Sequence, residues 1–335
     1  MTLRLLKTAQ TCLRTPYAAS CRCTPKQRRA AARHMSNIVL LILCFIIGIL
    51  LRKSKRMPVN TPAVLNTFII HVSLPALTLL YVHDLKISGD VGLMAAMAWI
   101  YFALAAGFFW LVGRWLKLPR RTVGALMLTG GLGNTSYLGL PMIEAYYGHQ
   151  GIASGIIVDQ LGSFLVVSTL GITVSGIYST GRPTVGDMAR RVLKFPPFIA
   201  LVIALLFIPV AYPEWMSTVL KRLGDTLAPL ALLAVGFQLR LGHLAGNVRN
   251  LGIGLAFKLV LAPLVLFLLY VPLLGAHGQA IQITLFEAAM PPMITAAILA
   301  TEHDLDPPLA TLMVALGLVI SFVTLTGWWW VLQGV

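Results

Sequence analysis

A glycine- and proline-rich stretch inside an apolar segment constrains the fold of this chain more than any other feature. Residues 130–141 contain four glycines and end at Pro141, within an apolar segment at residues 122–147 that is long enough to cross a bilayer. Glycine and proline are poor helix formers, so an unbroken membrane helix is not expected here. Lipid offers no hydrogen-bond partners, and the backbone groups freed by a break must find them in protein, water or ligand. The stretch therefore predicts an interrupted span that lines a cavity.

A second interrupted segment follows about 155 residues later, at a corresponding position of the second half. Residues 287–292 place Met290, Pro291 and Pro292 inside another apolar segment, at residues 278–301. Two interrupted spans in corresponding places of two halves are typical of the binding site of a secondary transporter. We therefore expect the two breaks to cross each other near the middle of the bilayer.

The composition indicates a multi-pass membrane protein. Of the 335 residues, 58% are hydrophobic and only 11% are charged, whereas a typical soluble domain has about 25% charged residues. A net charge of +15 in a soluble protein would suggest nucleic acid, but here the basic residues lie in a tail and in short loops. The positive-inside rule accounts for most of them, so no nucleic-acid partner is expected. The four cysteines form no ligand pattern, and no metal site is expected.

Hydropathy divides the chain after Ser36 into ten spans. We expect them at residues 36–51, 61–83, 91–113, 122–147, 151–177, 194–212, 217–239, 250–274, 278–301 and 307–332. Residues 35–178 then form a first unit of five spans and residues 194–332 a second one. A loop at residues 179–193 links the two units.

The basic residues of the loops predict the orientation. Fourteen follow the odd-numbered spans and three follow the even-numbered ones. The fourteen are Arg52, Lys53, Lys55, Arg56, Arg114, Lys117, Arg120, Arg121, Arg182, Arg190, Arg191, Lys194, Arg240 and Arg249, and the three are Lys86, Lys221 and Arg222. Loops after odd spans should therefore lie in the cytoplasm. The protein should lie in the cell membrane (the inner or plasma membrane), with both ends of the core on its outer side.

Residues 1–34 form a basic tail with eight Lys or Arg and no acidic residue. No apolar run in it resembles the core of a secretory signal. It is either a genuine basic or targeting tail, or upstream sequence translated from a start site placed too early, with Met35 as the true initiator. The second interpretation is favoured, because a basic outer tail conflicts with the orientation that the loops predict.

The two halves repeat each other. Residues 74–75 and 85–86 match residues 228–229 and 239–240, and similar matches recur in later spans at a nearly constant offset of about 155 residues. Each half has five spans, an odd number, so the second half should enter the membrane from the opposite side. The predicted fold is an all-α membrane protein of ten transmembrane helices, arranged as two inverted five-helix repeats with broken, crossing helices 4 and 9.

The crossing is the predicted substrate site. A half-helix that starts at a break presents unpaired N–H groups and the positive end of its dipole, which attract an anion without a full charge in lipid. The Asn134 side chain adds an amide that can donate to a carboxylate. The alternative is that the glycines serve close packing and Asn134 bonds across helices. The predicted substrate-binding residues are Asn134, Thr135, Ser136, Met290, Pro291 and Pro292.

Ionisable residues inside spans are costly and therefore suggest function. Asp159, beside Gln160 in the fifth span, and Glu287 are the candidates for coupling, because each could exchange a proton or, when ionised, help to hold sodium. Neutral carboxyl groups bonded between helices are the alternative. His71 and Asp225, each four residues before a proline, are gating or packing candidates.

Lys258 lies within the eighth predicted span. We expect its long side chain to snorkel to the cytoplasmic surface.

No enzyme motif is present in the sequence. It has no His-Glu-x-x-His pair for zinc, no Gly-x-Gly-Asp motif and no serine in a Gly-x-Ser-x-Gly context paired with a histidine at membrane depth. The glycine-rich residues 130–139 lack the Gly-Lys-Ser/Thr ending of a nucleotide-binding loop. Neither catalysis nor a cofactor is expected, and the coupling ion of a transporter would be H⁺ or Na⁺.

The two interrupted spans resemble those of the auxin efflux carrier family. Asn134 and Thr135, followed by the Gly-Leu-Pro run at residues 139–141, resemble its fourth span. The Ala-Ala-Met-Pro run at residues 288–291, continued by residues 300–307, resembles its ninth span and the following loop. The likeness covers residues 35–332 and is that of a bacterial-type permease, because the long cytoplasmic loop of many plant members is absent.

Membership would imply ten helices in two inverted repeats. Spans 1, 2, 6 and 7 would form a scaffold, the others a mobile transport unit, and two copies a homodimer. It would also imply an organic-anion substrate, which is indole acetate in plant members and a mono- or dicarboxylate such as malate or malonate in bacterial ones. Only Asn134 and Pro291 match the family motif closely enough to inherit a role. Gly133 stands where plant carriers tend to have proline.

The sequence thus predicts a secondary active permease of a small organic anion in the lipid bilayer, working by alternating access. A sodium-coupled symporter of bile-acid-carrier-like architecture is the nearest alternative. A membrane receptor without transport is a more distant one.

Overall fold

The computed structural model describes residues 25–83, 90–179, 192–207, 212–238 and 248–335, together with residues 186 and 190. The described residues are helical apart from their connections and one isolated β-bridge. Of the basic tail at residues 1–34, the first 24 residues lie outside the described part. Whether Met35 is the true start therefore stays a prediction.

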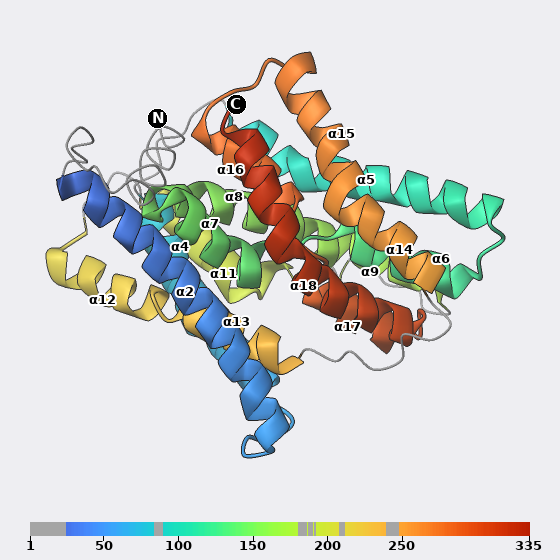
Figure 1. Ribbon diagram of the computed structural model, residues 1–335, viewed down its shortest axis with the longest axis horizontal. Helices are drawn as coiled ribbons and strands as arrows, with labels where there is room; N and C mark the ends of the chain where they lie inside the picture. The colour runs from blue at the N-terminus through green and yellow to red at the C-terminus, as the bar shows by residue number, and fades with distance from the viewer. Residues whose placement is uncertain are drawn as a thin grey trace, which may run out of the picture.

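The helices follow one another with short connections (Figure 1). The label η marks short π-helical turns and, at η3, a 3₁₀ turn. In the first half they are α2 (Pro25–Ser54), α3 (Thr61–Phe68), η1 (Ile69–Ser73), α4 (Leu74–His83), α5 (Val91–Trp115), α6 (Arg120–Gly131), η2 (Thr135–Gly139), α7 (Leu140–Tyr147), η3 (His149–Gly151), α8 (Ile152–Ile157), η4 (Val158–Phe164), η5 (Val167–Gly171) and α9 (Ile172–Tyr178).

In the second half they are α11 (Pro196–Leu206), α12 (Glu214–Gly224), α13 (Leu227–Gln238), α14 (Val248–Ala256), η6 (Phe257–Leu261), α15 (Ala262–Leu268), η7 (Leu269–Leu273), α16 (Gln279–Ala288), α17 (Ile294–Glu302) and α18 (Pro307–Leu332).

Five continuous helices in the described part are long and apolar enough to cross a membrane. They are Thr61–Val82, Val91–Trp115, His149–Tyr178, Val248–Leu273 and Pro307–Leu332. Each agrees within a few residues with a predicted span, namely the second, third, fifth, eighth and tenth. The described part of the chain is therefore all-helical apart from its connections, and its long apolar helices are typical of a multi-pass membrane protein. The total of ten spans and the inverted symmetry stay predictions.

Prolines shape two of these long helices. The π-helical turn η1 ends two residues before Pro75, and η6 ends two residues before Pro263. Proline lacks an N–H group, and its ring clashes with the carbonyl four residues earlier. A locally widened turn accommodates the ring and lets the helix continue.

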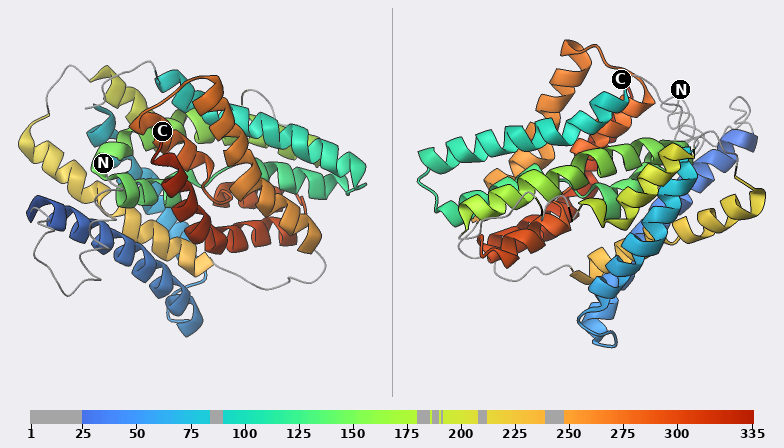
Figure 2. Two further views of the ribbon diagram at one scale, coloured as in Figure 1. Left: turned by 45° about the horizontal axis from the view of Figure 1, so that its top comes forward. Right: turned by 180° about the vertical axis from the view of Figure 1, so that it is seen from behind.

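Two groups of helices lie on different sides of the molecule. α2 packs along α13, and α4 packs against α11 and α12. α5 packs against α6, η4 and α16, while α18 packs against α6, α14, α16 and α17. Figure 1 shows α2, α12 and α13 at one side, α5 and α14 at the other and α18 between them. The view from behind in Figure 2 separates α5 from α2 in the same way.

Small residues allow the close approach of α2 and α13. A Cβ atom added at Gly236 would lie 2.2 Å from the Phe45 carbonyl oxygen, and one at Gly48 would lie 2.3 Å from that of Leu233. Backbone-to-backbone contact of this kind is how membrane helices gain dispersion energy without a hydrophobic driving force.

Candidate functional site

Both interruptions that the sequence predicts are present. α6 ends at Gly131, Leu132 is extended with φ −117° and ψ 128°, and the chain becomes helical again at Thr135. In the second half α16 ends at Ala288 and α17 begins at Ile294. Glycines weaken the first helix, whereas two consecutive prolines remove two N–H donors from the second.

The two interruptions cross each other as a short antiparallel pair. Gly133 forms an isolated β-bridge with Pro292. The Asn134 N–H donates to the Pro291 carbonyl at 2.8 Å, and the Met293 N–H donates to the Leu132 carbonyl at 3.0 Å. Backbone groups that lost their helical partners thus satisfy one another, as the lipid environment requires. We call residues 132–135 and 289–293 the crossing.

The predicted substrate-binding residues gather at the crossing. Asn134 and Thr135 are 3% and 1% exposed and Met290 is fully buried, while Pro291 and Pro292 are also buried. The Asn134 side-chain oxygen accepts a hydrogen bond from the Tyr137 N–H at 3.2 Å, so Asn134 is the N-cap of the half-helix formed by η2 and α7. Ser136, in the first turn of that half-helix, is partly buried.

Asp159 attaches η4 to the start of the same half-helix. Its Oδ1 accepts hydrogen bonds from the hydroxyls of Thr135 at 2.6 Å and Ser136 at 2.5 Å. Its Oδ2 accepts one from the Gln160 amide at 3.3 Å. These three hydrogen bonds replace those that the buried carboxyl group would form with water. A negative charge is also favourable at a helix N-terminus. Asp159 therefore fixes the position of the half-helix that begins at the crossing.

Glu287, the other coupling candidate, has a different environment. It is fully buried at the end of α16, and neither carboxyl oxygen has a hydrogen-bond partner among the described residues. The group lies against Gly139, where an added Cβ atom would come within 2.5 Å of Oε2. A buried carboxyl group without partners is costly in its charged form, so Glu287 needs a proton or a nearby cation.

Lys258 is the functional candidate that the sequence interpretation missed. It was expected to snorkel, which is wrong, because the residue is only 1% exposed. Its Nζ lies 4.0 Å from the centre of the Tyr101 ring and donates to the Ala288 carbonyl at 3.4 Å. The Tyr101 hydroxyl in turn donates to the Lys258 carbonyl at 2.8 Å. The ammonium thus sits at the carbonyl end of α16, the negative pole of its dipole.

Lys258 and Glu287 line one small cavity beside the crossing. Its volume is about 10 Å³, and Tyr101, Thr135 and Ser163 contribute polar groups to its wall. That volume is close to the lower limit for a single water molecule. Both residues therefore border the same confined space.

A larger cavity begins where α17 leaves the crossing. It has a volume of about 290 Å³ and lies between α13, α17 and α18. The wall is mostly apolar and begins with Ile294, while Gln238, Thr301 and Glu302 supply polar groups toward the ends of α13 and α17. Its size is near the lower end of the range of small-molecule sites.

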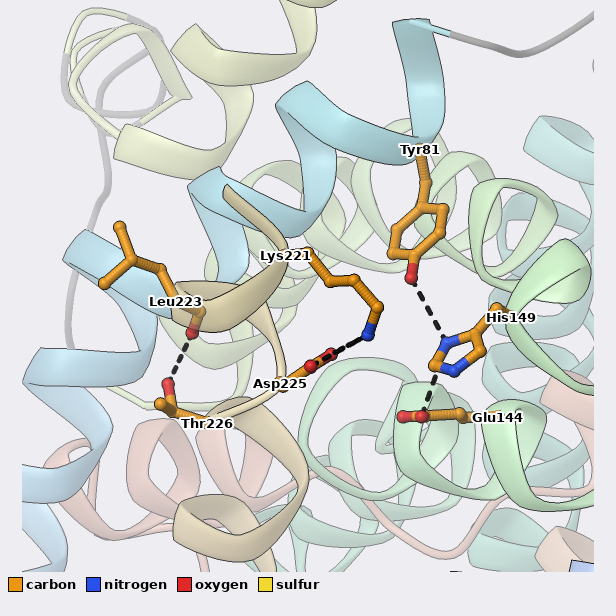
Figure 3. A network of polar contacts seen from close by, with 7 residues as sticks. All are labelled: Tyr81, Glu144, His149, Lys221, Leu223, Asp225 and Thr226. Carbon is orange, nitrogen blue, oxygen red and sulfur yellow. Dashed lines mark hydrogen bonds and ion pairs between the residues drawn. The ribbon is translucent and has the colours of Figure 1, made fainter. Parts of the chain in front are cut away.

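The two gating candidates lie outside the crossing. His71 is exposed, and its Nδ1 is 2.9 Å from the Thr67 carbonyl oxygen. Asp225 is exposed and forms an ion pair with Lys221 at 2.8 Å, in the region drawn in Figure 3. Both residues therefore stay gating or packing candidates outside the crossing.

Figure 3 also shows a contact between α4 and the α7–η3 turn that the sequence did not suggest. The Tyr81 hydroxyl is 3.2 Å from His149 Nδ1, and the two rings stack with centroids 6.2 Å apart. The same nitrogen is 3.4 Å from a carboxyl oxygen of Glu144. A single nitrogen can accept from Tyr81 when it is unprotonated or donate to Glu144 when it carries a proton, but cannot do both.

Residues that could bind a metal ion are scattered over the described part of the chain. No three His, Cys, Asp or Glu side chains there gather into a group that could hold a metal ion.

Comparison with known proteins identifies the kind of protein that carries this crossing. The profile of the family described as "Membrane transport protein" matches residues 34–178 and 184–329. An "Uncharacterized transporter" of Methanothermobacter thermautotrophicus is 28% identical over 298 residues, covering 88% of this chain and 95% of its own. Another, from Methanocaldococcus jannaschii, is 23% identical over 307 residues, covering 89% and 98%.

A "Putative malonate transporter" of Rhizobium meliloti is 24% identical over 314 residues, covering 88% of this chain and 95% of its own. These similarities indicate a transporter and not an enzyme. The matched family accounts for both halves of the chain, including both interrupted helices. The chain therefore belongs to the membrane transport protein family, the auxin efflux carrier family that its two interrupted spans resemble.

Proposed function

We propose that the protein is a secondary active transporter that moves a small organic anion, a mono- or dicarboxylate, by alternating access. The observation that carries this proposal is the crossing of two interrupted helices through the Gly133–Pro292 bridge. Helices that begin inside the membrane offer unpaired N–H groups and a positive dipole end to a ligand. An uninterrupted bundle would have no such polar backbone at this depth.

Electrostatics distinguishes the two half-helices. The one that starts at Thr135 already holds an acidic side chain, because Asp159 accepts hydrogen bonds from its first two residues. The other, α17, has no acidic residue in its first turn, and Ile294 opens onto the cavity of about 290 Å³. We therefore assign the carboxylate of the substrate to the N-terminus of α17.

The size and chemistry of this cavity favour a small substrate. A volume of about 290 Å³ suits a short mono- or dicarboxylate, whose apolar carbons would contact Val235, Ala297 and Val314. The similarity to a protein whose name specifies malonate supports a dicarboxylate of that size. Malonate is therefore the first substrate to test.

The arrangement also supports a route for alternating access. The cavity reaches Gln238 and Glu302 at the ends of α13 and α17, next to loops that the charge pattern assigns to the cytoplasm. On the other side, the Tyr81–His149 contact joins α4 to the α7–η3 turn. We infer a state open to the cytoplasm, in which α2, α4 and α11–α13 form the scaffold.

The remaining features follow from the same proposal. Ten helices would form two inverted five-helix repeats in the cell membrane, with both ends of the core outside. Two copies would form a homodimer through their scaffolds. Flux would be driven by H⁺ or Na⁺.

Transport of labelled malonate by the purified, reconstituted protein tests the proposal. We expect saturable uptake or exchange that malate reduces and that protein-free vesicles lack. The variant Ala297→Phe narrows the cavity, because Ala297 is 9% exposed in its wall. It should reduce flux at least about tenfold, since loss of about 1.4 kcal/mol of binding has that effect.

A matched substitution separates this effect from general damage. Val323 on α18 is 76% exposed, so Val323→Phe adds an aromatic ring outside the cavity and should leave flux unchanged. Absence of uptake and exchange for every mono- and dicarboxylate, in both gradient directions, would disprove the proposed function. Binding without flux would indicate a receptor, and stimulation of flux by external sodium would favour the bile-acid-carrier-like symporter.

A further inference from the structure

The two buried acids near the crossing differ in how completely they are bonded. Asp159 accepts hydrogen bonds from Thr135, Ser136 and Gln160. Glu287 is as deeply buried, yet neither of its carboxyl oxygens has a partner among the described residues. A fully bonded carboxyl group is fixed in place, whereas an unbonded one gains or loses a proton without breaking local hydrogen bonds.

A lysine ammonium is bonded to the backbone of the residue that follows the unbonded acid. Lys258 and Glu287 line the same cavity of about 10 Å³. The ammonium lies over the face of Tyr101 and donates to Ala288, the residue that follows Glu287. A cation at this point is stabilised by the ring and by the carbonyl end of α16. It is therefore positioned to offset part of the charge of an ionised Glu287 across the cavity that both residues line.

Few other ionisable groups face this pair. From η4, Asp159 is close enough to interact electrostatically with Glu287, and from α5, Tyr101 faces Lys258. On the α7–η3 side, Glu144 and His149 face each other. α15 and α18, which also pack against α16, contain no Asp, Glu, His, Lys or Arg.

We propose that Glu287 and Lys258 are the ion-coupling pair of this transporter, with Glu287 binding and releasing one proton per cycle and the Lys258 ammonium supplying a fixed positive charge beside it. The proton comes from water on one side of the membrane and leaves to water on the other. Asp159, held by hydrogen bonds from Thr135, Ser136 and Gln160, only positions the crossing. Net flux should then follow a proton gradient and not a sodium gradient. This inference rests on the proposed transport function.

The first test uses purified protein in vesicles with the membrane potential clamped and labelled malonate as the probe. An imposed difference of one pH unit should change the steady-state malonate ratio about tenfold if one proton accompanies each anion. A sodium gradient replacing a choline gradient should change it less than twofold. Glu287→Gln should abolish the response to pH, whereas Asp159→Asn should retain a response in whatever flux remains.

Exposed residues provide matched controls for these substitutions. Glu214 is the first residue of α12, Lys53 lies in the last turn of α2, and both side chains are exposed. Glu214→Gln and Lys53→Met should leave the tenfold response unchanged.

The second test needs no transport, because it measures thermal unfolding of purified variants in detergent. Lys258→Met and Glu287→Gln should each lower the melting temperature by roughly 5 °C, since each removes the opposite charge that offsets the buried group on the other residue. The double variant should be more stable than the sum of the two losses predicts. In the corresponding double-mutant cycle of Lys258→Met with Asp159→Asn, the two decreases in melting temperature should be close to additive.

Each outcome decides a separate point. Malonate exchange without any response to pH, or flux driven by sodium, would overturn the coupling pair while leaving the proposed function intact. Absence of all carboxylate exchange would overturn the proposed function, and the stability cycle alone would then decide whether the pair exists. Additive losses for Lys258 and Glu287, or strong coupling of Lys258 to Asp159, would overturn the pairing.

Discussion

Gly317→Ala should lower the melting temperature of the protein and reduce malonate flux at least about tenfold. Gly317 lies on α18 beneath the crossing, and a Cβ atom added there would come within 2.6 Å of Cδ of the Pro292 ring. A proline ring cannot rotate away, and Pro292 is tied by its bridge to Gly133. Either α18 or the crossing must therefore move, at a cost of about 1–3 kcal/mol.

Gly327→Ala is the matched control on the same helix. A Cβ atom added at Gly327 meets no atom within 4 Å. Alanine in an unhindered helix interior stabilises a protein by about 0.4–1 kcal/mol. The melting temperature in detergent and the exchange rate in vesicles should therefore separate the two variants. Equal behaviour of Gly317→Ala and Gly327→Ala would show that contact between α18 and the crossing has no role.

Asn134→Asp should abolish most transport while leaving the fold intact. Aspartate keeps the acceptor that caps the half-helix at the Tyr137 N–H, and a negative charge is favourable at a helix N-terminus. It removes the amide donor, however, and places a negative charge on the crossing, across from the segment that leads into α17, where the substrate carboxylate is assigned. We expect a melting temperature close to that of the native protein and malonate flux lowered at least about tenfold.

Asn134→Ala completes this comparison. It removes both the amide and the cap, so a stability loss of about 1 kcal/mol should accompany the loss of flux. The helix cap and substrate binding are thereby measured separately. If Asn134→Asp transported malonate at the native rate, Asn134 would have only its capping role.

The sequence was sufficient to locate both interruptions, because their causes are local. Glycines before Asn134 and the pair Pro291–Pro292 break helices through their own backbone chemistry. It was not sufficient to show how the freed groups are satisfied. The hydrogen bond from Asn134 to Pro291 joins residues in different halves of the chain, and only the packing of both halves brings them together.

Lys258 shows where hydropathy reasoning fails. The residue lies ten positions after Val248, at which α14 begins. A rise of about 1.5 Å per residue places it roughly 15 Å deep, near the middle of a bilayer core of about 30 Å. This depth was a signal against snorkelling that the sequence already contained. The partners that stabilise the ammonium, Tyr101 and the Ala288 carbonyl, come from distant helices and could not be identified from it.

His71 and Asp225 stay candidates for gating or packing. Their equivalent positions before prolines suggested a shared role, yet both side chains are exposed. The contact of Tyr81 with His149 had no sequence signal, because a tyrosine near the end of an apolar helix is ordinary at a membrane interface.

Protection of a cysteine at the start of α17 tests the central claim most directly. Ile294→Cys, in a background without the native cysteines, places a thiol where the cavity meets the crossing. Malonate should slow its modification by a maleimide at least about fivefold relative to sodium chloride of equal ionic strength. His277→Cys, in the exposed connection before α16, should react equally fast in both. Equal rates at Ile294→Cys with and without every carboxylate tested would contradict binding of an anion at the crossing.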